Sequence, residues 1–475
     1  MKGIFRNMNN RWSSLLLALA MVSVVATSCD DDDDTPQIVE PTNGTVLERV
    51  QNDPQLTILE TILTMPEFSD LAATAANDNA NITVFAPTDA AFASLLNTLG
   101  ATSLNDLPME VVREIVEYHI VGRQLMASQI TAGQVATVQG ESLTVTTTGG
   151  VQVDGIGVTQ ADVEADNGVV HKIGSVLLPA EPRAVAGTIL APAYFNNNFS
   201  ILVQALRTAG LVDDLLGEGP FTVFAPTNDA FAAAGITSLD GLTSEDLQPI
   251  LLYHVVSGEV MAADLSAGAV GTLAEEDFYV SLSDDGVFIN GMTEVVNTDV
   301  EGSNGVVHVI NRTLMPPTQN LVEIVQEMAS AEDGAEFTQL LAAVLRVSTG
   351  GGANLAEALS GNNDDMGYTV LAPTDAAFQA VYDADNGINS IDDIPVATLQ
   401  AILLTHVISG RVFSTDLMDG NVSPLQAGET LVIDAATPSV MVEGSNGANI
   451  NAGASNVLAT NGVIHVIDEV LMPAN

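Results

Sequence analysis

Cysteine is almost absent from this chain of 475 residues, because Cys29 is the only one. Disulfides therefore cannot brace a domain, and each domain must be stabilised by its own hydrophobic core. Basic residues are also scarce, with 12 Lys and Arg against 60 Asp and Glu. The formal net charge of −48 argues against nucleic acid and anionic lipid headgroups as partners. Such a surface serves solubility, or it attracts divalent cations and basic partners.

Long apolar runs are missing too, except near the N-terminus. A positive start, Lys2 to Arg11, precedes an apolar run of 14 residues from Trp12 to Val25. A membrane-spanning helix needs roughly 20 such residues, so this run predicts an export signal over residues 1–28 rather than a span. Its removal would take the formal charge from −48 to −51 and leave Lys172 as the only lysine.

Cys29 follows three small residues and resembles the cysteine of a bacterial lipobox, which becomes a lipidated N-terminus. The alternative is an ordinary cleavage site beside an incidental thiol. Asp30–Asp34 must stay solvated, so residues 29–46 are expected to form an acidic tether. Acidic residues next to such a cysteine also resemble the surface-export signal of lipoproteins in the Bacteroidetes lineage. The resemblances imply export and lipid anchoring at the bacterial outer membrane, facing the cell surface or, alternatively, the periplasm.

One pattern occurs three times in the rest of the chain. Its first part is "TVFAPTDAAF" at Thr83–Phe92, "TVFAPTNDAF" at Thr222–Phe231 and "TVLAPTDAAF" at Thr369–Phe378. An apolar, helix-like run that ends in a histidine follows each time, at His119, His254 and His406. A closing "NGVVH" or "NGVIH" segment supplies a second histidine, at His171, His308 and His465. A fixed order at a long period indicates one domain duplicated in tandem.

Within each repeat, helical periodicity comes first, as in Ser200–Leu211, and strand-like alternation later, as in Ser142–Thr147. This order predicts an α+β module. A threonine is placed to cap the helix after each signature strand: Thr88, Thr227 and Thr374. The next residue is expected in the first turn of that helix, where the helix dipole favours a carboxylate: Asp89, Asn228 and Asp375.

Together, the "TVFAPTDAAF" block, the Tyr-His pairs Tyr118–His119 and Tyr253–His254, and "NGVVHVI" resemble the motifs of the fasciclin (FAS1) domain. The resemblance implies three tandem modules, each a twisted antiparallel β-sheet wedge with a helical cap. It places them at residues 47–180, 183–317 and 319–475, which we call the first, second and third module. It also implies extracellular adhesion or matrix interaction.

The third module is longer than the others. The closing histidines His308 and His465 are 157 residues apart, whereas His171 and His308 are 137 apart. The extra length falls in two polar, Gly- and Asn-rich segments, Ser348–Gly367 and Val442–Gly462. Such insertions predict surface loops, where binding diverges between related domains.

Sequence motifs of catalysis and metal binding are missing. The chain has no HExxH, GxSxG, P-loop or dinucleotide motif, and no pair of histidines at helical spacing. Each of the six histidines is therefore predicted to be a buried, hydrogen-bonded core residue rather than a metal ligand or an acid–base group. The Asp or Asn after "APT" is read as a capping residue rather than a catalytic acid. We expect no cofactor, no metal and no enzymatic activity.

The sequence thus predicts a non-enzymatic surface lipoprotein that binds cells, extracellular matrix protein or polysaccharide, with self-association as a further option. Contact with a membrane is expected only through the lipid on Cys29. The alternative is a glycan- or nutrient-capture lipoprotein that works with an outer-membrane transporter. Its motivation is the pair of Gly- and Asn-rich segments in the third module.

Overall fold

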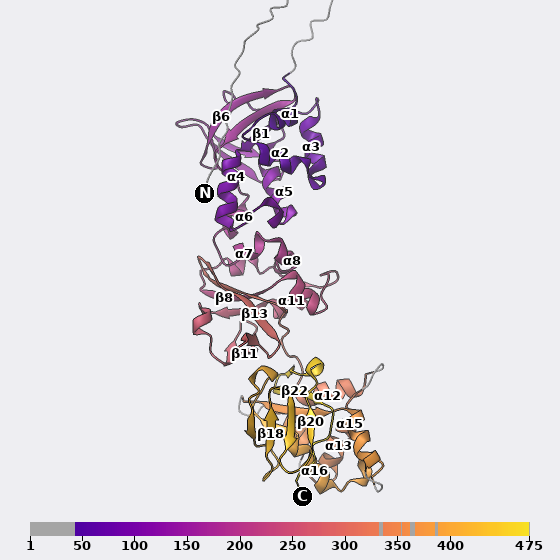
Figure 1. The fold of residues 1–475 in the computed structure, drawn as a ribbon. Helices are drawn as coiled ribbons and strands as arrows, with labels where there is room; N and C mark the ends of the chain where they lie inside the picture. Colours follow the sequence, from indigo (N-terminus) through magenta and orange to yellow (C-terminus); the bar gives the residue numbers. More distant parts are fainter. Residues whose placement is uncertain (1–42, 332–335, 353, 362–365, 385–387, 475) are drawn as a thin grey trace, which may run out of the picture. The chain divides into compact units, whose positions relative to one another are not determined.

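The computed structural model describes residues 43–331, 336–352, 354–361, 366–384 and 388–474 (Figure 1). Cys29 and the acidic run after it lie outside the described residues. Within the described ranges, no helix is long and apolar enough to cross a membrane.

The first module begins with helices and ends with strands, as expected. Its helices are α1 (Val46–Gln51), α2 (Thr57–Thr64), α3 (Ser69–Ala76), α4 (Asp89–Leu99) and α5 (Met109–Tyr118). Its strands are β1 (Ile82–Pro87), β2 (Ile120–Val121), β3 (Gly133–Ala136), β4 (Ser142–Thr146), β5 (Gln152–Val153), β6 (Ile156–Ala165) and β7 (Gly168–Ile173). The strand order in the sheet is β2-β1-β7-β6-β5-β4-β3.

The sheet is mostly antiparallel, but the signature strand β1 pairs with the closing strand β7 in parallel. The expected α+β module is confirmed, and its antiparallel sheet differs from the expectation only in this central parallel pair. A parallel pair needs a long crossover, and α4, α5 and the other strands supply it. Every residue of β1 and β7 is buried. A strand pair buried on both faces explains why both segments read as near-continuous apolar runs.

The second module repeats this architecture. Its helices are α7 (Ala191–Tyr194), α8 (Ser200–Ala209), α9 (Val212–Leu215), α10 (Asn228–Ala233) and α11 (Ser244–Leu252). Its strands are β8 (Phe221–Pro226), β9 (Val255–Ser257), β10 (Gly268–Gly271), β11 (Asp277–Ser283), β12 (Gly286–Ile289), β13 (Thr293–Gly302) and β14 (Gly305–Ile310). The order β10-β11-β12-β13-β14-β8-β9 again pairs the signature and closing strands in parallel. A short helix, α6 (Ala180–Val185), covers the expected joint at Glu181–Pro182.

The third module has helices α12 (Leu321–Ala329), α13 (Thr338–Thr349), α14 (Leu355–Ser360), α15 (Asp375–Ala384) and α16 (Val396–Thr405). Its strands are β15 (Tyr368–Pro373), β16 (Val407–Ser409), β17 (Gly420–Val422), β18 (Leu431–Asp434), β19 (Ser439–Val442), β20 (Gly447–Asn449), β21 (Val457–Ala459) and β22 (Gly462–Ile467). They form two four-stranded sheets, β16-β15-β22-β21 and β17-β18-β19-β20. β15 and β22 are again parallel.

The two insertions of the third module are not simple surface loops, so that expectation was wrong for their described residues. Ser348–Gly367 contains α14, which buries Leu355 and Leu359. Val442–Gly462 contains β20 and β21 and buries four apolar side chains, Val442, Ala448, Ile450 and Ala459. These few inward-facing residues fix the structure, although Gly, Asn and Ser dominate the composition around them.

Two apolar cores lie on either side of the parallel strand pair in the first module. Val50, Leu59 and Ile115 belong to the core between this pair and the helices. Phe85, Leu143 and Val153 belong to the core that β3, β4 and β5 enclose from the other side. The module is thus stabilised by apolar burial on both faces of β1 and β7.

Lys172 on β7 is a departure from the apolar pattern. Its counterparts in the closing strands of the other modules are Val309 and Val466, given the shared register with the signature strand. The Lys172 side chain is 7% exposed and forms an ion pair with Asp53. Its ammonium also donates to the Gln55 side chain at 3.1 Å. These contacts tie the loop between α1 and α2 to the sheet.

This arrangement generates a stability prediction. Asp53→Ala leaves a buried ammonium without its counter-charge and should cost about 3 kcal/mol of local stability. Lys172→Val should cost less than about 1 kcal/mol, because valine fills the same position in the other modules and Asp53 can rehydrate. Hydrogen exchange of the β7 amides measures both effects. A larger loss for Lys172→Val than for Asp53→Ala would contradict the account.

Candidate functional site

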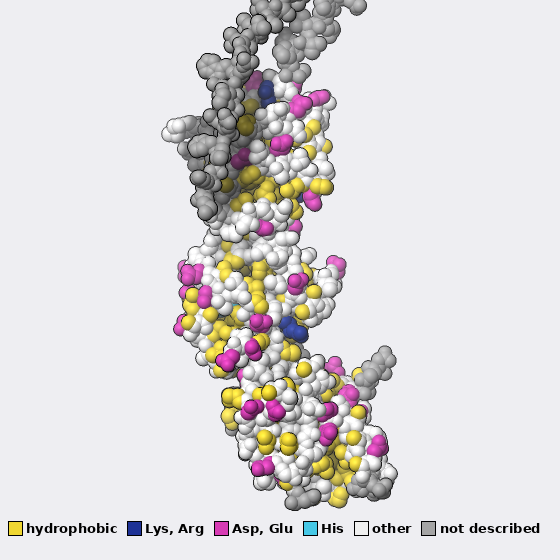
Figure 2. Space-filling model, in the orientation of Figure 1, with side chains coloured by type: hydrophobic (Ala, Val, Ile, Leu, Met, Phe, Trp, Pro, Cys, Tyr) yellow, Lys and Arg dark blue, Asp and Glu magenta, His cyan; other side chains and the backbone are white. Residues whose placement is uncertain are grey.

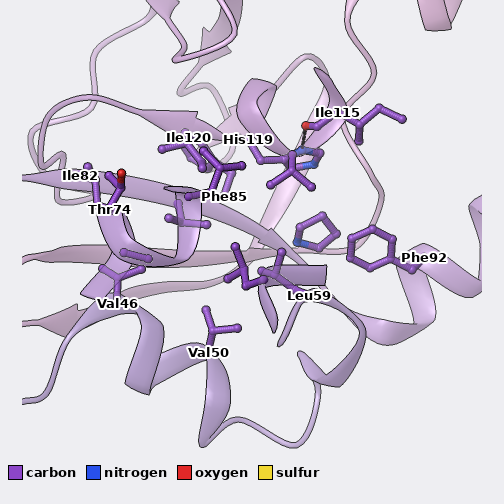
Figure 3. Close-up of a pocket in the computed structure, with 16 residues that line it drawn as sticks. Val46, Val50, Leu59, Thr74, Ile82, Phe85, Phe92, Ile115, His119 and Ile120 are labelled. Atoms are coloured by element: carbon purple, nitrogen blue, oxygen red, sulfur yellow. Dashed lines mark hydrogen bonds between the residues drawn. The ribbon is translucent and has the colours of Figure 1, made fainter. Parts of the chain in front are cut away.

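The first repeated histidine ends the helix that precedes the second strand of its module. His119 is the C-cap of α5 and is 3% exposed. Its Nδ1 lies 2.6 Å from the Ile115 carbonyl oxygen, and the Leu177 N–H donates to Nε2 at 2.9 Å. Figure 3 shows the ring among apolar side chains of the helices and the sheet. Because Nε2 accepts a hydrogen bond, Nδ1 carries the proton and the ring is neutral.

The same arrangement recurs in the other modules. His254 Nδ1 lies 2.7 Å from the Ile250 oxygen, and Leu314 donates to Nε2 at 2.9 Å. His406 Nδ1 lies 2.8 Å from the Ile402 oxygen, and Leu471 donates to Nε2 at 2.9 Å. The preceding residue is buried as well, whether it is Tyr118, Tyr253 or Thr405. The Tyr-His motif is therefore an internal contact and not an exposed adhesive surface.

The second histidine lies on the closing strand and uses the opposite tautomer. His171 is fully buried, with Nε2 2.8 Å from the Leu125 oxygen and Nδ1 accepting from the Asp162 N–H at 3.1 Å. Asp162 has a φ of 52° at an irregularity of β6, so the ring holds this bulged backbone in place. The counterparts are His308 with Val260 and Asp299, and His465 with Val412 and Asn456.

Burial makes four of these rings poor acid–base groups. It lowers the pKa of His119, His254 and His406 from 6.5 to about 4, because a charged ring would be desolvated. Burial also lowers the pKa of His465. Both nitrogens of each histidine are engaged with the backbone, which leaves no lone pair for a metal. Among the described residues, no group of three His, Cys, Asp or Glu side chains could hold a metal ion.

The three threonines after the signature strands cap the following helices. Thr88 accepts from the Ala91 N–H, Thr227 from Ala230 and Thr374 from Ala377. These bonds satisfy one of the free N–H groups at the start of α4, α10 and α15.

The residue that follows each capping threonine has a role that the sequence did not reveal. Asp89 accepts from the Ile58 N–H at 2.9 Å and from the Thr57 hydroxyl at 2.8 Å, so it caps α2 from the start of α4. Asp375 binds the Gln339 N–H at 2.9 Å and the Thr338 hydroxyl at 2.6 Å in the same way. Asn228 accepts from Ile201 at 3.0 Å and donates to Asn197. Each side chain joins two helix N-termini, because both favour an oxygen acceptor.

The asparagine of the closing Asn-Gly turn was also missed as a structural centre. Asn167 is 2% exposed and makes three hydrogen bonds to distant backbone. Its Oδ1 accepts from the Val46 N–H at 2.7 Å, and its Nδ2 donates to the Ala75 and Asn77 oxygens at 2.9 Å. The second and third modules repeat the pattern with Asn304 and Asn461. The only sequence signal was the recurrence of Asn at this place.

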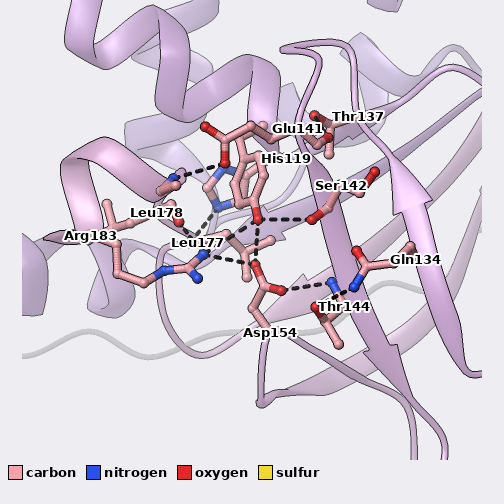
Figure 4. A network of polar contacts seen from close by, with 12 residues as sticks. His119, Gln134, Thr137, Glu141, Ser142, Thr144, Asp154, Leu177, Leu178 and Arg183 are labelled. Atoms are coloured by element: carbon pink, nitrogen blue, oxygen red, sulfur yellow. Dashed lines mark hydrogen bonds and ion pairs between the residues drawn. The ribbon is translucent and has the colours of Figure 1, made fainter.

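The first module carries a charged network at the Tyr-His motif that has no counterpart among the described residues of the other two (Figure 4). The Tyr118 hydroxyl donates to Asp154 Oδ2 at 2.7 Å, and Arg183 forms an ion pair with the same oxygen at 3.2 Å. Burial, followed by the hydrogen bond to Asp154, raises the pKa of Tyr118 to about 12. In the second module Asn290 donates to Tyr253 instead, without a charge. A tyrosine that holds its proton so tightly positions α5 and does not serve as a base.

Each module also encloses a small apolar cavity beside its first histidine. The volumes are about 30 Å³ in the first module, 20 Å³ in the second and 50 Å³ in the third. Cofactor and drug-sized sites measure roughly 300–1,000 Å³. These cavities are packing gaps between the helical cap and the sheet (Figure 3).

The histidine geometry generates a pH prediction. His119, His254 and His406 should show no change in their ring-proton NMR shifts between pH 8 and about pH 5.5, because their pKa is about 4. Between pH 6.5 and 4 the unfolded chain binds a proton at each site and the folded chain does not. Stability should therefore fall as the pH falls through this window, by about 1.4 kcal/mol per pH unit for each histidine. Ordinary titration near pH 6.5 at any of the three would contradict it.

Comparisons with known proteins agree with this architecture. A family model described as "Fasciclin domain" matches residues 55–179, 197–316 and 336–473. Protein sll1483 of a Synechocystis strain is 46% identical over 136 residues, which cover 28% of this chain and 75% of that protein. Transforming growth factor-beta-induced protein ig-h3 of Oryctolagus cuniculus is 27% identical over 370 residues, or 76% of this chain and 50% of the relative. Human periostin is 28% identical over 402 residues, or 83% and 44%.

The chain thus spans half or less of the length of ig-h3 and periostin. Among solved structures, a FAS1 domain pair from the insect cell adhesion molecule fasciclin I is 22% identical, with a TM-score of 0.25. That match covers 57% of this chain and 95% of the solved chain. The three family matches together cover well over half of the sequence, and the chain belongs to the fasciclin domain family with three such domains.

Proposed function

We propose that this protein is a non-enzymatic attachment lipoprotein that binds cells, extracellular matrix or polysaccharide through the surfaces of its fasciclin domains. The observation that carries the proposal is the burial of the residues that the three domains share. The six histidines and three closing asparagines are at most 8% exposed, and internal hydrogen bonds engage them. The shared motifs therefore build a scaffold, and recognition is left to exposed side chains that differ between domains.

The charge of the surface restricts the classes of partner that the protein can bind. Figure 2 shows acidic side chains spread over the visible face and very few basic ones. With a formal net charge of −48, the protein repels polyanions and favours neutral or basic partners.

The proposal includes the location. An export signal over residues 1–28, a lipid on Cys29 and the solvated Asp30–Asp34 would hold the domains away from the outer membrane on the cell surface. A single acyl chain binds a membrane only marginally, so more than one chain on this cysteine is required for stable anchoring.

The described residues of the third module weaken the motivation for the alternative of glycan or nutrient capture beside an outer-membrane transporter. It relied on the two insertions of the third module as open binding loops. Their described residues instead form α14, β20 and β21 with buried side chains.

Attachment of living cells tests the proposal. We expect a strain that lacks the gene to attach less to a polysaccharide-coated or matrix-coated surface, and the wild-type gene to restore attachment. Cys29→Ala should restore protein synthesis without attachment, since the chain would lose its lipid anchor. Unchanged attachment of the deletion strain across several surfaces would refute the attachment role. Full attachment with Cys29→Ala would refute the anchor alone.

A further inference from the structure

The outward face of β3, β4 and β5 in the first module has an unusual composition. Along these strands the inward side chains are apolar and buried: Val135, Leu143, Val145 and Val153. Five outward positions carry hydroxyl or carboxamide groups: Gln134, Ser142, Thr144, Thr146 and Gln152. Four of them are exposed and Gln152 is half-buried. We call these five residues the hydroxyl–amide face.

The face contains no charged side chain, although the chain carries 60 carboxylates. Two acids flank the face. Glu141, next to Ser142, accepts from the Ala180 N–H, and Asp154 is 11% exposed and is engaged by Tyr118, Arg183 and the Thr144 N–H. Figure 4 shows Gln134, Ser142 and Thr144 on neighbouring strands beside this network. The absence of charge distinguishes the face from the rest of an acidic surface.

The equivalent positions of the other modules differ. Because Gln134 is paired with Thr144, Ala269 with Tyr279 and Asn421 with Val432, the three faces can be aligned residue by residue. The second module then has Asp277 where the first has Ser142, and the third has Asp434 where the first has Thr146. Of these aligned rows, only that of the first module consists of uncharged hydrogen-bonding groups.

Cross-strand hydrogen bonds join four of the five side chains in two pairs. The Gln134 carboxamide donates to the Thr144 hydroxyl at 3.1 Å, and the Thr146 hydroxyl donates to Gln152 at 3.4 Å. These cross-strand bonds limit the side-chain entropy that a ligand would otherwise have to remove on binding. The sheet spaces the groups about 7 Å apart along a strand and about 5 Å apart between strands.

We infer that the hydroxyl–amide face binds a neutral polysaccharide, an inference that rests on the attachment function proposed above. Hydroxyl and carboxamide groups both donate and accept, as sugar hydroxyls do, and a neutral polymer is not repelled by the acidic chain. A protein partner would need a buried aromatic or aliphatic anchor, which these five positions do not offer. The face also has no aromatic side chain on which a sugar ring could stack, so its affinity for a single sugar is weak. A polymer binds more tightly because several of its sugar units contact the face at once.

Affinity electrophoresis of the full exported chain tests the inference, with dextran, a mixed-linkage β-glucan or galactomannan in the gel and alginate as the anionic comparison. We expect retardation by at least one neutral polymer and none by alginate. Gln134→Glu with Thr146→Glu should weaken the binding at least tenfold, since each charge must be desolvated under the ligand. Asn421→Glu, at the position equivalent to Gln134 in the third module, is the matched control and should change binding less than twofold.

The outcomes separate this inference from the attachment function. Retardation by none of the neutral polymers overturns it, and so does binding that Gln134→Glu with Thr146→Glu leaves intact. If cell attachment persists in either case, the proposed function stands with a different binding surface. If the deletion strain attaches normally as well, both fail. Thermal unfolding of each variant checks that the exposed substitutions leave the fold intact.

Discussion

The structure depends on one buried side chain in each module, the asparagine of the closing turn. Asn167 binds the first turn of α1 and the last residues of α3 while it leads into β7. The start of α1, the end of α3 and the start of β7 therefore meet at a single carboxamide. A buried amide with its donors and acceptors satisfied fixes these segments in one arrangement, whereas an unpartnered one would cost roughly 1–3 kcal/mol.

The other polar residues that the modules share are also hydrogen-bonded within their own module. The histidines fix the end of α5 and the bulge of β6, and Asp89 joins the N-termini of α2 and α4. The donors and acceptors of these side chains are already bonded to the backbone. They are therefore not available to act on a substrate. Differences between the modules lie elsewhere, in the Lys172 ion pair, the Tyr118 network and the hydroxyl–amide face of the first module.

Local features of the fold could be predicted from the sequence, and long-range ones could not. The order of helices and strands follows from periodicity, and the burial of His171 follows from its apolar neighbours. Strand direction is invisible in a single strand, so the parallel pair was missed. An Asn-Gly pair is read as a turn, which hides the distant partners of Asn167. Asp89 caps a helix that lies 31 residues earlier, and Ile450 is buried within a segment of polar composition.

Hydrogen exchange of an Asn167→Ala variant tests the central claim most directly. The account predicts faster exchange in α1 and α3, by about tenfold or more, because three hydrogen bonds to these segments are lost. Exchange in the second and third modules should be unchanged, and Asn97→Ala on the exposed side of α4 should have no such effect. Unaltered exchange of α1 and α3 in Asn167→Ala would contradict the claim that the closing asparagine holds the helical cap to the sheet.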